Sequence, residues 1–248
     1  MLLTLTISRL YDSALALLYP QPCKVCGASV ESRADGFVCR DCWLATRVFC
    51  GAEVTCWKCG VPAAGHLSGG RNEAVRCGRC EDELFSAARS CGVYEKALRA
   101  AVLSLKTEPY LPRRLGHLLA SAAARPPLAR ATRIIPVPLH PIRQRLRGFN
   151  QAEIIGSEVA RITGRILDTN SLYRRVHTER HRAGMDAIAR RATVKDIFAV
   201  RHRRVVAGET VLLVDDVYTT GATASACAGA LLEAGAQEVL LLTIARTS

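Results

Sequence analysis

Two adjacent carboxylates, Asp215 and Asp216, end an apolar run in the segment VLLVDDVYTTGAT at residues 211–223. A carboxylate pair can accept hydrogen bonds from vicinal sugar hydroxyls, either directly or through Mg²⁺ and its waters. The same pair would repel a bare phosphate, because like charges at short range destabilise each other. The two aspartates therefore indicate a ligand that carries neighbouring hydroxyl groups.

The residues TTGAT that follow favour an anion instead. At the start of a helix, unpaired backbone N–H groups and the helix dipole attract negative charge. Glycine permits close backbone approach, and threonine hydroxyls add donors. In the simpler alternative an Asp and a Thr only cap a plain helix, which leaves most of the set unexplained. The whole segment suits a ribose 5-phosphate, whose phosphate would be held by Thr219, Thr220, Gly221, Ala222 and Thr223.

Eight of the 11 cysteines form Cys-x-x-Cys pairs, in which two sulfurs on one tight turn can point at one metal ion. Without a secretory signal a disulfide framework is disfavoured, and thioredoxin-like redox pairs would need an α/β context. We expect two structural zinc sites, paired sequentially along the chain, with crossed pairing as the alternative. A closed site of four cysteines leaves no position for substrate. The ligands are Cys23, Cys26, Cys39, Cys42, Cys56, Cys59, Cys77 and Cys80.

Other residues near these pairs have simpler roles. Gly27 and Gly60 directly follow two of the pairs, where the turn tolerates positive φ. Cys50, Cys91 and Cys227 lack the paired spacing, so we expect one loop thiol and two small core residues.

The elements that position the aspartates alternate between helix and strand beyond residue 91. Apolar periodicity predicts helices at 94–105, 115–124, 151–162 and 222–233, and strands at 133–137, 210–214 and 238–244. Runs such as VLLV and VLLLTI imply a parallel sheet that is covered on both faces. Ligands of such sheets lie beyond the carboxyl ends of the strands, where the aspartates fall. The expected fold class is α/β, a parallel sheet with flanking helices that follows a small double zinc-ribbon module.

Composition and charge limit the possible classes of protein. With 248 residues, 49% hydrophobic and 23% charged, the chain is globular, and no apolar run is long enough to span a bilayer. The expected organisation is an amphipathic N-terminal helix at 1–20, a double zinc ribbon at 21–85 and an α/β domain at 91–248. The first helix is expected to dock on the protein rather than on a membrane, and the protein is expected to be cytoplasmic. Residues 1–92 hold 10 basic and 9 acidic side chains, whereas residues 93–248 hold 24 and 13.

The segment VLLVDDVYTTGAT resembles the phosphoribosyl-diphosphate (PRPP) signature of type I phosphoribosyltransferases. Together with the four cysteine pairs and with IIPVPLHPIRQRLRGFNQAE at residues 134–153, the chain resembles the ComF (competence protein F) family from Cys23 to Arg246. The resemblance implies a type I phosphoribosyltransferase-like fold and Mg-PRPP as ligand. It also implies transfer or sensing of the phosphoribosyl group, with a link to DNA uptake in natural transformation and to DNA-uptake proteins as partners.

The resemblance also implies roles for individual residues. Asp215 and Asp216 would hold the ribose hydroxyls, and the TTGAT loop would hold the 5-phosphate. The PVPLH segment would bind pyrophosphate, with Lys106, Arg143 and Arg147 as anion contacts. Mg²⁺ would draw charge from the leaving pyrophosphate. Segment 174–192 would form a mobile hood over an acceptor, which the sequence does not name, and its TERHRAGM lacks the glutamine that the family pattern leads us to expect.

Two other functions keep the same motifs. The first is a non-catalytic module that binds single-stranded DNA on a phosphoribosyltransferase fold. Segment 143–204 holds 15 basic and 6 acidic residues, which suits a phosphate backbone, although a solvated arginine-rich loop explains the same charge. Stacking aromatics are few there, namely Phe149, Tyr173 and Phe198. The second is a PRPP sensor without turnover. His140, His177 and His181 are expected to be surface residues.

Overall fold

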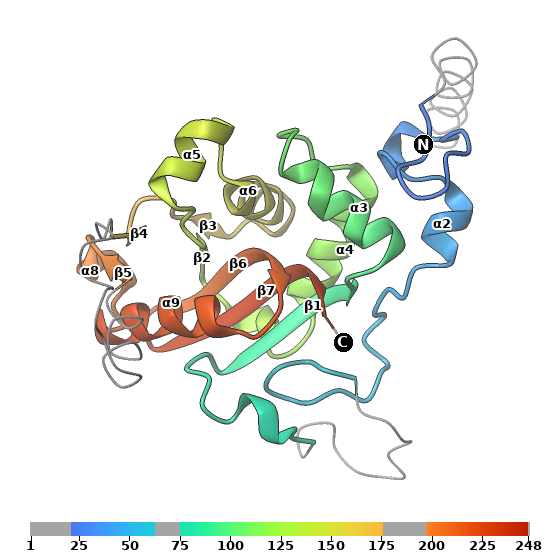
Figure 1. Ribbon diagram of the computed structural model, residues 1–248. Coiled ribbons are helices and arrows are strands. Elements are labelled where there is room, and N and C mark those ends of the chain that lie inside the picture. The colour runs from blue at the N-terminus through green and yellow to red at the C-terminus, as the bar shows by residue number, and fades with distance from the viewer. Residues whose placement is uncertain (1–20, 63–74, 176–196, 248) are drawn as a thin grey trace, which may run out of the picture.

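A computed structural model describes residues 21–62, 75–175 and 197–247 of the chain (Figure 1). The predicted N-terminal helix at 1–20, His177 and His181 lie outside these residues, as does nearly all of the predicted hood at 174–192. None of the helices in the described part is long and apolar enough to cross a membrane.

Five parallel strands form the central sheet in the order β1-β7-β6-β2-β3. The central strands β6 and β7 are apolar on both faces, and residues 211–214 and 239–242 are at most 1% exposed. This burial explains why their sequences show no alternation and confirms the predicted parallel sheet. The strands are β1 Ala87–Val93, β2 Arg133–Pro136, β3 Ile166–Leu167, β6 Thr210–Tyr218 and β7 Glu238–Arg246.

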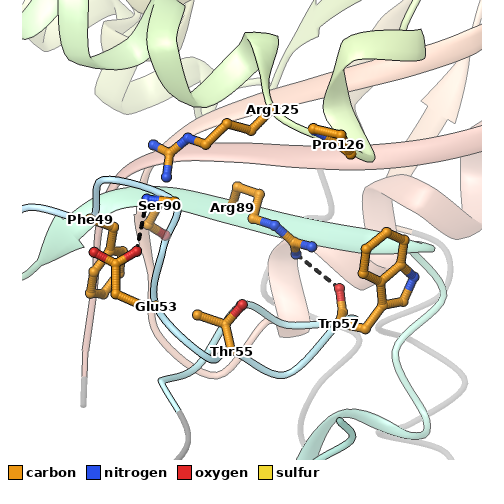
Figure 2. A pocket seen from close by; sticks show the side chains of 10 residues that line it. Phe49, Glu53, Thr55, Trp57, Arg89, Ser90, Arg125 and Pro126 are labelled. Carbon is orange, nitrogen blue, oxygen red and sulfur yellow. Dashed lines mark hydrogen bonds between the residues drawn. The ribbon is translucent and has the colours of Figure 1, made fainter. Parts of the chain in front are cut away.

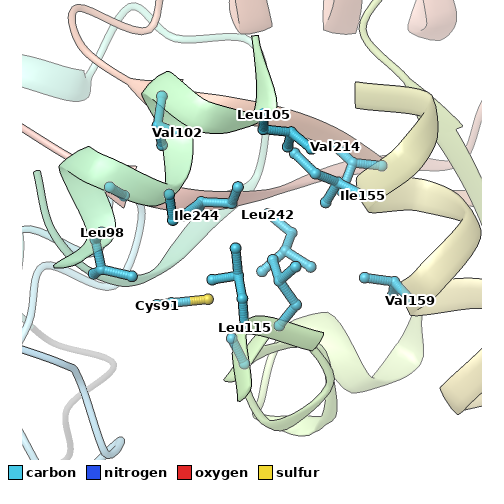
Figure 3. Packing of buried hydrophobic residues seen from close by; sticks show 14 of the residues in the cluster. Cys91, Leu98, Val102, Leu105, Leu115, Ile155, Val159, Val214, Leu242 and Ile244 are labelled. Atoms are coloured by element: carbon cyan, nitrogen blue, oxygen red, sulfur yellow. The ribbon is translucent and has the colours of Figure 1, made fainter. Parts of the chain in front are cut away.

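Helices cover the two faces of the sheet unequally. One face packs against α3 (Lys96–Leu105), α4 (Arg113–Ala124) and α6 (Gln151–Thr163). Figure 3 shows this layer, in which apolar side chains of the three helices meet Val214, Leu242 and Ile244 of the sheet. The other face packs against α9 (Ala222–Glu233) and the small antiparallel pair β4 (Leu172–Arg174) and β5 (Phe198–Val200).

The shorter helices lie outside these two layers. Helix α5 (Pro141–Arg147) follows β2, and it has no buried residue. Helix α8 (Arg203–Val206) precedes β6. In the first zinc ribbon, a 3-10 turn (Arg33–Asp35) is followed by α2 (Arg40–Leu44). Two more 3-10 turns are Gly78–Cys80 and Leu128–Arg130.

Most predicted elements are present, with changed ends. The helix expected at 151–162 runs to Thr163 and ends at Gly164, whose φ of 72° terminates it. The strand expected at 210–214 is longer, because β6 continues through both aspartates to Tyr218. Strand β1 and helix α5 were not predicted. Strand β1 pairs with β7 and begins at Ala87, in the stretch between the two predicted domains.

Candidate functional site

The two aspartates at the end of β6 point to opposite faces of the sheet, because side chains alternate along a strand. On the face of α3 and α6, the Oδ2 atom of Asp216 lies 3.6 Å from the Nζ atom of Lys106 and 3.5 Å from the Nε2 atom of Gln151. On the face of α9, Asp215 lines a small cavity together with Thr223. The alternation was not foreseen, because the strand was expected to end before the aspartates.

The electrostatic environment of Asp215 differs from that of an ordinary surface carboxyl. Burial raises the pKa of Asp215 to about 8, and the neighbouring charge of Asp216 adds to the effect. The backbone N–H of Asp216 donates a hydrogen bond of 2.8 Å to the Oδ1 atom of Asp215. The raised pKa favours the protonated form of Asp215, whose hydroxyl could then donate a hydrogen bond to a sugar oxygen.

The TTGAT loop joins β6 to α9 in the expected way. Gly221 is the N-cap residue of α9, and its φ of 85° is one that glycine adopts without strain. The residues on both sides of the glycine, Thr219, Thr220, Ala222 and Thr223, are exposed. The loop therefore presents hydroxyl groups and the free N–H groups of a twelve-residue helix to the solvent.

A carboxylate that the sequence did not reveal lies against this loop. A Cβ atom on residue 221 would lie 2.6 Å from the Oε1 atom of Glu83 and 2.9 Å from the hydroxyl oxygen of Tyr218. Burial raises the pKa of Glu83. The next residue, Leu84, donates its backbone N–H to the hydroxyl of Ser225 in α9. Glu83 follows the zinc ligand Cys80 by three positions, and no motif marks it, so only the folded chain reveals its place.

The predicted pyrophosphate contacts are only partly brought together. Arg147 donates a hydrogen bond to Gln151, which in turn approaches Asp216. Asn150 caps α6 and donates to the carbonyl of Val137, so that the start of α6 is fixed beside the end of β2. Arg143 is exposed on α5, and no hydrogen bond or ion pair of its side chain is found among the described residues. Sequence reasoning missed Gln151, although it lies within the quoted motif.

The eight paired cysteines form two clusters with sequential pairing. Within each cluster the ligand atoms all lie within 4.8 Å of one another. Neighbouring Sγ atoms are 3.6 Å apart in the first cluster and 3.4–3.7 Å apart in the second. A tetrahedral zinc site with Zn–S bonds of about 2.3 Å requires Sγ–Sγ distances of about 3.8 Å, so the donor set fits zinc. The first cluster is Cys23, Cys26, Cys39 and Cys42, and the second is Cys56, Cys59, Cys77 and Cys80.

The three unpaired cysteines lie where the sequence predicts. Cys50 is exposed in a loop, whereas Cys91 and Cys227 are buried in the core.

The second cluster borders the TTGAT loop. A cavity of about 550 Å³ is lined on one side by ligands of this cluster and on the other by Thr219 and Thr220. Arg246 at the end of β7 is buried, and its guanidinium donates a hydrogen bond of 2.5 Å to the carbonyl of Cys59. The same guanidinium lies 5.1 Å from the centre of the Tyr218 ring. Arg246 therefore contacts both the second zinc ribbon, at Cys59, and the strand of the candidate site, at Tyr218.

The sequence is similar to a known zinc-binding domain and to proteins of DNA utilization and competence. A family model described as a double zinc ribbon domain matches residues 14–81. The DNA utilization protein YhgH of Salmonella typhi is 30% identical over 243 residues, which cover 94% of this chain and 93% of that protein. Competence protein F of Haemophilus influenzae is 34% identical over 114 residues, 46% of this chain and 49% of that protein. The match thus spans about half the length of that relative.

Among solved structures, two enzymes match part of the chain. Glutamine PRPP amidotransferase from B. subtilis has a TM-score of 0.38 and 24% identity, covering 52% of this chain and 25% of that chain. An allosteric regulatory enzyme of purine biosynthesis has a TM-score of 0.40 and 23% identity, covering 58% and 30%. Both TM-scores are low.

The parallel sheet and the two cysteine clusters define an α/β protein whose sheet follows a double zinc ribbon. The long match to YhgH and the matches to competence proteins then identify the family. The chain belongs to the ComF family.

Proposed function

We propose that this protein binds Mg-PRPP, or a related ribose 5-phosphate, at the end of β6 and transfers or senses its phosphoribosyl group during DNA uptake. The observation that carries the proposal is the approach of two separate segments to Asp216, which precedes the TTGAT loop by three positions. Lys106 comes from the end of α3, Gln151 from the start of α6, and the phosphate loop directly follows β6. Such a cationic and hydroxyl-rich setting around a carboxylate matches a ligand with both phosphates and hydroxyls.

The phosphate groups would be held at two places. The loop 219–223 would bind the 5-phosphate through its N–H groups and hydroxyls. Lys106 would release Asp216, from which it is 3.6 Å away, and contact the pyrophosphate. Arg147 donates a hydrogen bond to Gln151 and would contact the pyrophosphate next to that residue. Arg143 would have to reach the pyrophosphate from the exposed helix α5.

The ribose would lie beside β6 just past the end of β2, where the pairing of the two strands stops at Val214 and both aspartates can be reached. The protonated Asp215 would donate to one hydroxyl, and Asp216 would accept from the other. Magnesium in sugar-phosphate sites is bound by one or two carboxylates and by ligand oxygens, and Asp216 supplies a carboxylate of this kind. Bound Mg²⁺ would neutralise charge that develops on the departing pyrophosphate. The proposed compartment is the cytoplasm, where cysteine zinc ligands stay reduced.

Titration calorimetry with Mg-PRPP tests the proposal. The wild-type protein is compared with an Asp215→Asn/Asp216→Asn variant and with Asp168→Asn, whose carboxylate lies in the turn after β3. Zinc content and circular dichroism are checked first for all three proteins. We expect the wild type and Asp168→Asn to bind and the double variant to lose at least tenfold in affinity. Absence of binding by folded, zinc-loaded wild type would contradict the proposal.

Binding of single-stranded DNA is a second candidate function, and the exposed helix α5 favours it. Arg143 and Arg145 project from a helix without buried residues, and the described part of the chain offers neither of them a carboxylate partner. Fluorescence anisotropy with a labelled single-stranded oligonucleotide would measure binding at several salt concentrations. Arg143→Gln/Arg145→Gln is expected to weaken binding and to reduce the salt slope by about 1.4, because each single-strand phosphate contact contributes about 0.7. Arg161→Gln, which breaks an ion pair with Glu158, is the control and should change neither quantity.

A further inference from the structure

A second concave site lies on the edge of the sheet, away from the end of β6. A cavity of about 220 Å³ is enclosed by strand β1, the end of α4 and the loop that leads into the second zinc cluster. Figure 2 shows Arg125 on the side of α4, Arg89 on β1, and the loop with Glu53, Thr55 and Trp57 opposite them. None of these residues belongs to the site proposed for PRPP.

Both arginines of the cavity lack a carboxylate partner within the described ranges, whereas other arginines near the sheet have one. Arg130 pairs with Glu238, and Arg133 pairs with Glu209. The salt bridges found in the structure include neither Arg89 nor Arg125. Two partly buried guanidinium groups facing one cavity destabilise each other, and a bound anion would relieve that repulsion.

The hydrogen bonds of the two guanidinium groups leave several donors free for a ligand. The Nη1 group of Arg89 donates to the carbonyls of Trp57 at 2.9 Å and of Ala88 at 2.7 Å. The Nε atom of Arg125 donates to the carbonyl of Ser121 at 3.3 Å. Burial lowers the pKa of Arg89, and the positive charge of Arg125 lowers it further. A guanidinium has five N–H donors, so each side chain retains donors for an oxyanion.

Glu53 also lines the cavity, and its carboxylate is held by donors of its own loop. Its carboxylate accepts hydrogen bonds from the backbone N–H groups of Cys50 at 2.7 Å and Gly51 at 2.8 Å, and from the Cys50 thiol at 3.2 Å. Although burial opposes ionisation, these hydrogen bonds lower the pKa of Glu53. The carboxylate is therefore turned toward the backbone of its own loop, and the two arginines outnumber this one carboxylate in the lining of the cavity.

We infer that this cavity binds the phosphate group of a small phosphorylated ligand. Two arginines that approach from different elements suit a tetrahedral oxyanion, because each can take a different pair of its oxygens. The volume of about 220 Å³ is below the range of about 300–1,000 Å³ typical of sites for drug-sized molecules, so the site admits a phosphate with a small substituent. Trp57 lies between the zinc ligands Cys56 and Cys59, so the bound phosphate would join the second ribbon to β1.

The two tryptophans of the chain make this inference directly measurable. Trp57 lines the cavity, whereas Trp43 is 2% exposed in the first zinc ribbon. Full-length, zinc-loaded protein labelled with 5-fluorotryptophan should give two ¹⁹F resonances, which Trp57→Phe assigns. Titration with inorganic phosphate is expected to shift the Trp57 resonance and leave that of Trp43 in place. A Trp57 resonance that does not move with any phosphate probe would overturn the inference.

Variants separate this cavity from the phosphate loop. Arg125→Gln is expected to weaken the Trp57 response at least about tenfold, because charge-assisted hydrogen bonds are lost. Arg161→Gln, with the same change of charge outside the cavity, should leave it unchanged. Thr220→Ala/Thr223→Ala should also leave it unchanged, and loss of the response in that variant would place the phosphate at the loop and refute the inference.

The source of the phosphate is distinguished by two further probes. A nucleoside 5′-monophosphate and a 5′-phosphorylated single-stranded oligonucleotide are titrated against the same labelled protein. A stronger response to the mononucleotide than to the oligonucleotide is expected from the small volume of the cavity. A response to the oligonucleotide that also occurs without its 5′-phosphate, with none to the small phosphates, would contradict the inference.

Discussion

The two zinc ribbons share one metal-binding pattern but pack on opposite faces of the sheet. Cys23, Cys39 and Trp43 of the first ribbon belong to the same buried cluster as α3 and α4. Cys56, Cys59 and Cys80 of the second ribbon are buried with α9 and Tyr218. The first ribbon therefore supports the layer of α3 and α4, and the second borders the candidate site, since α9 begins at the TTGAT loop.

The contacts of each ribbon reflect this difference. In the first, the indole N–H of Trp43 donates to the carbonyl of Asp35, and the Asp35 carboxylate pairs with Arg114 of α4 at 2.9 Å. In the second, Arg246 reaches the carbonyl of Cys59, and Glu83 lies against Gly221. Two copies of one metal-binding motif can thus have different structural roles, because the residues around each metal site determine which face of the sheet that copy packs against.

Removal of one zinc site at a time should have the largest effect. Cys23→Ser/Cys26→Ser and Cys56→Ser/Cys59→Ser are each expected to reduce the zinc content from two ions to one, because two thiolates cannot replace four. Structural zinc contributes roughly 10–16 kcal/mol to such modules, so the affected ribbon should unfold. Elemental analysis and limited proteolysis measure both effects. Only the second variant should also lose Mg-PRPP affinity. Equal losses of affinity in both variants would contradict the inference that only the second ribbon supports the candidate site.

Truncation of the large buried ring on each face should cost less. Trp43→Ala and Phe85→Ala are each expected to lower the free energy of unfolding by about 3–5 kcal/mol. Urea unfolding followed by circular dichroism measures this cost. Phe85 contacts Tyr218 edge to face, with ring centres 6.0 Å apart, so its truncation should also weaken ligand binding. Calorimetry at a urea-free, fully folded condition should find the affinity of Trp43→Ala unchanged, and a matching loss there would count against the comparison.

The glycines that follow the second cysteine of a pair allow a finer test. Gly27 and Gly60 have φ values of 78° and 68°, so alanine at either position costs about 1 kcal/mol of strain. A Cβ atom at Gly27 would meet nothing within 4 Å, whereas at Gly60 it would lie 2.6 Å from the carbonyl oxygen of Ala88 in β1. Gly60→Ala is therefore expected to cost roughly 2–4 kcal/mol in urea unfolding. Similar costs for both substitutions would argue that the second ribbon is not tightly seated on β1.

A further predicted effect separates the two aspartates by pH. Because the pKa of Asp215 is raised to about 8, the folded state retains a proton that the unfolded state loses near pH 4. Stability should therefore fall as pH rises from about 4 to about 8, by at most about 1.4 kcal/mol per pH unit. Asp215→Asn should remove this decline, as measured by urea midpoints at several pH values.

Asp168 gives a control of opposite sign for the pH experiment. Burial opposes its ionisation, but hydrogen bonds from Ser171 and Asn170 lower its pKa overall. Its contribution is present above the unfolded pKa and is lost as pH falls, so Asp168→Asn should alter only the acidic side of the profile. A decline above pH 5 that persists in Asp215→Asn would show that another group causes it.

Local signals in the sequence were sufficient for most of the fold. The apolar runs of β6 and β7, the glycine after α6 and the spacing of the cysteines each reflect a short-range rule. Strand β1, with Arg89 and Ser90 in its middle, lacks a clear pattern, because its pairing with β7 rather than its composition makes it a strand. Helix α5 buries no residue and so shows no amphipathic period.

The candidate site was predictable to a similar degree. The aspartates and the TTGAT loop form one continuous motif, so they could be read directly. Glu83 and Gln151 reach the site only through tertiary packing. No motif marks Glu83, and the motif at 134–153 contains Gln151 without indicating its contact with Asp216. The opposed directions of Asp215 and Asp216 depend on where β6 ends, and ends of elements are the least certain part of any sequence-based expectation.

The position of β1 at the edge of the sheet has a consequence during synthesis on the ribosome. Its sheet partner is β7, and Ala87 lies 153 positions before Leu240, with which it is in register. At about 5–20 residues per second, β1 emerges roughly 8–30 s before its partner. All eight zinc ligands precede β1, so the ribbons can fold before β7 has been synthesised and while β1 is still unpaired. A nascent chain short of zinc would carry unfolded ribbons as well as an unpaired strand, and would meet proteases before its sheet could close.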